Sequence, residues 1–263
     1  METLMHLLEF KILIVFFIII VAQIGAYLAL KTKKSKQGKL YLSLGNTFSA
    51  GIFLGAGLIH MLPDATEEFS TVIKSDFPFS PFIATLGFLL ILFIEKVFIV
   101  KSEHSSQVNT KKEKTTFSPY ILLFILSIHS IIVGIALGTE NQMTQSIIIA
   151  IAVLAHKGSA SFALVVDMIK SNLNNTLIIK LIIFFSFMTP LGILLGALIS
   201  NVLSGSVANL TIAFFDALAA GTFIYIAIME ILNEEFVESK HNLLKFTMSS
   251  LGLLLMALLA VWL

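Results

Sequence analysis

The 263-residue sequence contains no cysteine and no arginine, and all 17 basic residues are lysine. The absence of cysteine excludes a disulfide framework and a thiolate metal site, so a metal ion would need histidine, carboxylate, hydroxyl, amide or thioether ligands. Charged residues make up only 13% of the chain, whereas soluble domains contain roughly a quarter. The lysines lie in short loops or inside apolar segments, which excludes a basic face for nucleic acid. This composition is typical of an integral membrane protein.

Long apolar runs make up most of the sequence: 57% of the residues are hydrophobic and the mean hydropathy is +0.96. A helix needs about 20 apolar residues to cross the hydrocarbon core, and helices this long satisfy their own backbone groups there. Runs of this length lie at about residues 12–30, 41–62, 82–100, 118–138, 146–170, 177–201, 209–232 and 243–263. The sequence therefore predicts an all-α, polytopic integral membrane protein with eight transmembrane helices in a single domain, residues 1–263. We expect the run at 12–30 to be a retained span, because the first ten residues, METLMHLLEF, carry two glutamates and no lysine, whereas a signal peptide has a basic start.

The lysines are concentrated in the odd-numbered loops. They are Lys31, Lys33, Lys34, Lys36 and Lys39 in the first loop, Lys101, Lys111, Lys112 and Lys114 in the third, and Lys170 in the fifth. The positive-inside rule places these loops, including the lysine-containing loop 101–117, in the cytosol. Both termini would then be extracellular or lumenal, although the acidic seventh loop gives this topology no support. The sequence does not distinguish the plasma membrane from an organelle membrane.

Three local signals concern helix geometry. Ser118 followed by Pro119 predicts a helix start, with the serine as N-cap and the proline at the first helical position. Pro190 predicts a kink inside the sixth span. Glycines in the second and sixth spans allow close approach between helices.

Ionisable residues at membrane depth are costly and therefore indicate function. They are His60, His129, His156, Lys157 and Glu230, with Asp216 and Glu95 as further candidates. A single histidine can be explained as a neutral ring bonded to a carbonyl at a helix interface. Three histidines and a carboxylate favour a shared cation, because imidazole and carboxylate are common ligands of Zn²⁺. A structural ion pair between Glu230 and Lys157 is an alternative, because a buried glutamate must be protonated or paired.

The stretch GLIHMLPDATEEF contains further candidate metal-binding residues, which lie at the outer end of the second span. His60 and Asp64 would share a helix face if the helix continued through Pro63. Asp64, Glu67 and Glu68 would form an acidic entrance that concentrates cations. The alternative is an ordinary helix end with solvated acids.

The motifs HSIIVGIALG, LAHKGSASFAL, LIHMLPDA, MTPLGILLGAL and DALAAGTFIYIAIMEIL, in this order across eight spans, resemble the ZIP (Zrt-, Irt-like) metal transporters, in particular the zinc-importing subfamily with His-Lys in the fifth helix. The resemblance implies a divalent-metal transporter that needs no cofactor, is not an enzyme, and moves zinc, or iron, manganese or cadmium, into the cytosol. It also implies that His129, Ser130, His156 and Glu230 contribute to the metal site. His60 would lie on the entrance side, with Asp64 just outside it.

The sequence departs from the family pattern at Val133, where the family usually has an acid four residues after the histidine of the fourth helix. Lys157 stands where some relatives have a ligand of a second metal, and an ammonium group cannot coordinate a cation. We therefore expect one metal site rather than two. A non-transporting ZIP-like membrane scaffold stays open as an alternative. An intramembrane zinc hydrolase is disfavoured because no H-E-x-x-H motif is present. The sequence does not determine the oligomeric state, for which a homodimer is one option.

Overall fold

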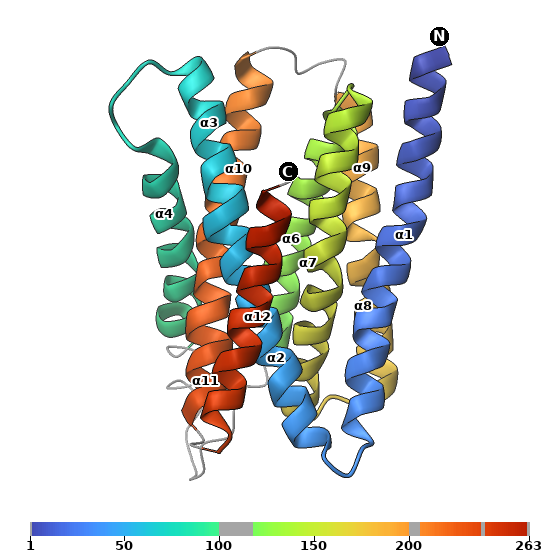
Figure 1. The fold of residues 1–263 in the computed structure, drawn as a ribbon, viewed down its shortest axis with the longest axis vertical. Helices are drawn as coiled ribbons and strands as arrows, with labels where there is room; N and C mark the ends of the chain where they lie inside the picture. Colours follow the sequence, from blue (N-terminus) through green and yellow to red (C-terminus); the bar gives the residue numbers. More distant parts are fainter. Residues whose placement is uncertain (1, 100–117, 200–205, 238–239, 262–263) are drawn as a thin grey trace.

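The computed structural model describes residues 2–99, 118–199, 206–237 and 240–261. In these ranges the chain forms helices and no strand, and eight of the helices are long and apolar enough to cross a membrane. The prediction of an all-α protein with eight spans is confirmed. The loop predicted at 101–117 lies outside the described residues. The first and last helices run antiparallel, so the two ends of the chain point to the same side (Figure 1).

Four spans are made of more than one helical segment. The spans are α1 (Glu2–Lys33); α2 (Gly38–Gly55) with η1 (Ala56–Met61) and α3 (Leu62–Val72); α4 (Phe79–Phe93) with η2 (Ile94–Ile99); α6 (Ser118–Thr139); α7 (Met143–Lys170); α8 (Asn175–Ser186) with α9 (Met188–Ile199); α10 (Ser206–Tyr225) with η3 (Ile226–Leu232) and α11 (Asn233–Val237); and α12 (Asn242–Ala260). The segments η1, η2 and η3 are π-helical. Helix α6 begins at Ser118, as the sequence predicts.

The two prolines within spans have different effects. Pro63 does not end the second span, because it falls in the first turn of α3 directly after the π-helical segment η1, where the missing N–H group is tolerated. Pro190 accompanies a break in the sixth span: α8 ends at Ser186 and α9 begins at Met188. The helix is therefore interrupted close to the proline for which the sequence predicts a kink.

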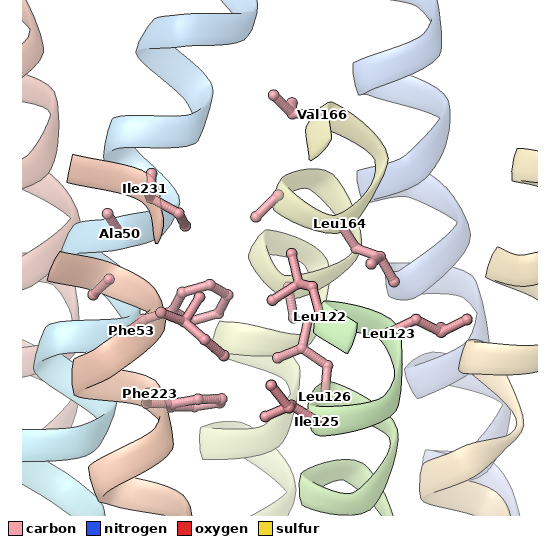
Figure 2. Packing of buried hydrophobic residues seen from close by; sticks show 14 of the residues in the cluster. Ala50, Phe53, Leu122, Leu123, Ile125, Leu126, Leu164, Val166, Phe223 and Ile231 are labelled. Atoms are coloured by element: carbon pink, nitrogen blue, oxygen red, sulfur yellow. The ribbon is translucent and has the colours of Figure 1, made fainter. Parts of the chain in front are cut away.

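The spans pack as two bundles. The first bundle consists of α1, α6, α7, α8 and α9, and its main pairings are α6 with α9 and α1 with α7. The second bundle consists of α2 to α4 and α10 to α12, paired mainly as α12 with α2 and α10 with α4. The bundles meet where α2 packs on α7 and α10 on α6. Figure 2 shows the apolar cluster at this interface, with Phe53 and Phe223 opposite Leu122, Leu126 and Leu164.

The two ends of the protein differ in charge. We call the end with Lys31, Lys33, Lys34, Lys36, Lys39 and Lys170 the lysine end, and the opposite end with Asp64, Glu67, Glu68 and Glu140 the acidic end. Helix α2 begins at the lysine end and α7 finishes there, whereas α3 finishes at the acidic end, drawn at the top of Figure 1.

Glycines bring helix backbones together inside each bundle. In the first bundle Gly134 of α6 faces Gly192 of α9, and in the second bundle Gly87 of α4 packs on the backbone of Leu218 in α10. A Cβ atom at position 134 would lie 2.4 Å from the carbonyl oxygen of Thr189. Backbone atoms cannot rotate away, so these contacts hold each bundle together at a fixed helix separation.

Gly134→Ala is expected to lower the free energy of unfolding by about 1–3 kcal/mol, because the new methyl group overlaps a rigid backbone. Thermal unfolding in detergent micelles measures the change. The control is Gly158→Ala, whose Cβ would lie 3.2 Å from the flexible Cγ1 of Val21 and is expected to be close to neutral. Equal melting temperatures for the two variants would contradict the rigid contact.

Candidate metal-binding site

Two buried histidines from neighbouring helices of the first bundle lie side by side near the middle of the spans. His129 of α6 and His156 of α7 are 4% and 5% exposed, and their ring centroids are 5.6 Å apart. Within the described part of the chain, neither ring nitrogen of His129 has a hydrogen-bond partner, nor does Nδ1 of His156. Unpaired nitrogen atoms in an apolar interior are costly, and an imidazole nitrogen is a ligand for a divalent metal ion.

An aromatic side chain of the second bundle covers this pair. The ring of Phe223 in α10 lies 4.1 Å from the ring of His129 and 5.9 Å from that of His156, centroid to centroid. Phe53 of α2 stacks behind Phe223 at 4.9 Å. The histidine pair therefore belongs to the interface between the two bundles and is shielded from that side by aromatic rings.

Lys157, next to His156, is 2% exposed and its ammonium group is held inside the first bundle. Its Nζ donates to Ser130 Oγ at 2.9 Å, Thr189 Oγ1 at 3.1 Å and the carbonyl oxygen of Phe185 at 3.4 Å. It also lies 3.7 Å from the centroid of the Phe185 ring, which favours a cation. The hydroxyl of Ser130, a candidate metal ligand, therefore accepts from Lys157 in this structure.

Glu230 is not brought to the histidines or to Lys157. No ion pair joins Glu230 and Lys157 among the described residues. Glu230 in η3 is instead a hydrogen-bonding partner of Glu95 in η2. The Tyr225 hydroxyl donates to Oε2 of Glu95 at 2.5 Å, and the Lys96 ammonium forms an ion pair with Oε1 of Glu95. Two carboxyl groups share a hydrogen bond only when one carries a proton. This pair lies toward the lysine end, because η2 is the last described segment of its span and η3 is followed only by the short α11.

The candidate residues at the acidic end, His60 and Asp64, lie close together because they are four residues apart on one helix. Because the second span continues through Pro63, His60 and Asp64 share a face, and His60 Nδ1 lies 2.8 Å from Asp64 Oδ2. Asp216 of α10 is close enough to both for charge–charge interaction, and Glu68 interacts in the same way with Glu67 and Asp64. His60 also interacts electrostatically with His129 and His156. His60 therefore lies within electrostatic range of both the acidic side chains at this end and the histidine pair.

These residues form three groups along the bundle axis rather than one cage. On α10 and η3, Asp216, Phe223 and Glu230 follow one another at seven-residue intervals, about 10 Å apart in a helix. No group of three or more His, Asp or Glu side chains in the described ranges is arranged to hold a metal ion. Val133, four residues after His129, packs against an apolar cluster that includes Ile14 and Leu137, so its side chain makes hydrocarbon contacts.

Sequence reasoning identified the ionisable residues but missed the apolar and hydroxyl groups around them. Phe223, Thr189 and Tyr225 are functional neighbours that carry no distinguishing signal, since they lie in apolar spans like many similar residues. Asp216 and Glu95 were among the ionisable candidates, but their partners depend on how distant spans pack.

Comparisons with known proteins agree on one family. A family model described as ZIP zinc transporter matches residues 8–119 and 100–260. Zinc transporter ZIP1 from Mus musculus is 28% identical over 256 residues, which cover 84% of this chain and 79% of the relative. Zinc transporter ZIP2 from Homo sapiens is 27% identical over 267 residues, covering 85% and 86%. Protein zntD from Dictyostelium discoideum is 35% identical over 155 residues, or 57% of this chain and 22% of its own length.

Thr189→Val is expected to lower the free energy of unfolding by about 1–3 kcal/mol, because the buried ammonium of Lys157 loses an acceptor that water cannot replace. Thermal unfolding in detergent measures it. The control is Thr211→Val, since the exposed hydroxyl of Thr211 donates only to Val207 of its own helix. If both variants melt at the same temperature, Thr189 is not a significant partner of the lysine.

Proposed function

The chain belongs to the ZIP zinc transporter family, and we propose that it moves zinc into the cytosol along the interface between its two bundles. The observation that carries this proposal is the pair His129 and His156, whose buried ring nitrogens lack partners in the described structure. Two imidazoles from adjacent helices can bind a zinc ion that completes its coordination with water. The family consists of transporters, and this chain is not an enzyme.

The proposed path has three stations. At the acidic end Asp64, Glu67 and Glu68 attract the cation, and His60 with Asp64 binds it first. His129 and His156 hold it at the middle. Glu230 and Glu95 receive it on the way to the lysine end. The spacing of about 10 Å along α10 and η3 allows a partly hydrated ion to pass from one station to the next.

Lys157 makes the middle station a site for one metal ion. Its fixed ammonium group is held by two hydroxyls and a carbonyl, and it stands beside the two histidines. A positive charge there repels a second cation and weakens binding of the first. With Val133 in place of an acid, no described carboxylate offsets this charge at the middle, so the proposed site binds weakly and releases readily.

Alternating access follows from the way in which the bundles are built. Glycine contacts fix the helices inside each bundle, whereas side chains such as Phe223 and Phe53 fill the interface between them. Movement of one bundle against the other would expose the histidine pair first to the acidic end and then to the lysine end. We propose that the lysine end is cytosolic, which follows from the positive-inside rule and places both termini outside or in a lumen.

His129→Ala and His156→Ala are each expected to reduce zinc uptake to near background, since each removes half of the middle station. Uptake of radioactive zinc by proteoliposomes under a gradient measures the rate. The control is His6→Ala, whose ring is exposed near the N-terminal end of α1 and bonds to Glu9.

Iron, manganese and cadmium are tested as competitors, because ligand type alone does not select among these metals. Uptake unchanged in the double variant would show that zinc does not pass these rings, and a chain without uptake would favour the scaffold alternative.

Val133→Glu is expected to lower the zinc concentration at half-maximal uptake severalfold, or to change the preferred metal. The substitution supplies a carboxylate four residues from His129, on the same helix face. Val133→Gln is the matched control, because it has a similar shape without the negative charge. Identical kinetics for these two variants would show that position 133 is remote from the transported ion.

A further inference from the structure

An ion pair joins the two bundles at the lysine end. Lys170, the last residue of α7 in the first bundle, lies 2.6 Å from Glu235 Oε1 and 2.8 Å from Glu234 Oε2. Both glutamates belong to α11 in the second bundle. None of these residues belongs to the proposed zinc path. Their contact instead lies across the interface that the proposed movement would open.

Glu235 is anchored firmly within its own bundle. Its side chain is 5% exposed and accepts from Asn46 Nδ2 at 2.9 Å and from the Ser43 hydroxyl, both on α2. Its backbone carbonyl accepts from the Lys245 ammonium of α12. The carboxylate keeps its two hydrogen bonds to α2, and the backbone its bond to α12, when α7 moves away, so the position of Glu235 does not depend on Lys170.

Lys170 is the member of this ion pair that can separate from the others and enter water. Its side chain is 26% exposed, and it stands at the end of its helix, where a long lysine stem reaches water easily. Separation would return the ammonium to solvent while Glu235 kept its neutral donors. The asymmetry makes the contact reversible, unlike a buried pair in which both charges are left without partners.

We propose that Lys170 with Glu234 and Glu235 is a latch that holds the lysine end closed. This inference rests on the proposed function, because a latch matters only if the bundles separate during transport. Opening toward the lysine end must break the contacts of Lys170, so the latch stabilises the state in which the histidine pair is shut off from that side.

Accessibility of a single cysteine tests the latch without depending on transport. The chain contains no cysteine, so Val166→Cys introduces one reactive thiol. Val166 is completely buried on α7, one turn before Lys170 and on the same helix face. Its reaction with a charged, membrane-impermeant maleimide is followed in nanodiscs, with and without Lys170→Met. The control thiol is Ile178→Cys, equally buried at the lysine end but on α8, which packs within the first bundle.

The expected result is severalfold faster labelling at position 166 in Lys170→Met, with labelling at position 178 unchanged and with Lys170→Arg close to the parent. The charge-retaining variant Lys170→Arg separates loss of the ion pair from unfolding, because an unfolded chain would label fast at both positions. Equal labelling with and without Lys170→Met, or acceleration at both positions, would overturn the latch. Zinc uptake by the parent chain is measured separately. Its absence would overturn the proposed transport, whereas the labelling rates would still decide whether Lys170 closes this end.

Discussion

A polar group in the hydrocarbon core has no water to bind, so each ionisable side chain at that depth depends on a partner inside the protein. Lys157 meets this demand with two hydroxyls and a carbonyl. Lys11 meets it with the carbonyls of Gly138 and Glu140 at the end of α6. Among the buried ionisable side chains that the structure describes, only His129 and His156 keep ring nitrogens without partners. This exception is the observation on which the proposed zinc site rests.

The packing of the helices is the reason to propose that the site lies between the bundles. Inside each bundle, glycines such as Gly134 and Gly87 bring backbones into contact and leave no space for an ion. Between the bundles, larger side chains fill the space, and Phe223 touches both histidines from the opposite side. Side chains can change rotamer, whereas two contacting backbones cannot, so the interface is the part of the fold able to admit and release a hydrated ion.

The elements of the fold could be predicted because their signals are local. The length of the apolar runs predicts the eight spans. The Ser118–Pro119 pair predicts the start of α6, and Pro190 indicates the interruption before α9. The pairings in the site could not be predicted in this way. Glu230 and Glu95 both lie in π-helical segments, where an extra residue per turn rotates the following side chains away from the face that α-helical spacing suggests. Phe223 is one of 23 phenylalanines, and only packing distinguishes it from the others.

The distribution of charge along the proposed path bears on how a middle station with a positive charge and no carboxylate could work. The middle has two imidazoles and an ammonium, while the carboxylates lie on either side, with Asp216 and Asp64 toward one end and Glu95 and Glu230 toward the other. At an effective dielectric constant of about 20, a divalent ion and one carboxylate about 10 Å apart attract by roughly 3 kcal/mol. Because carboxylates at both ends attract the ion similarly, the ion has no deep free-energy minimum at the middle station. In the proposed path, an acid at position 133 would create such a minimum, whereas the valine present there would favour passage over retention.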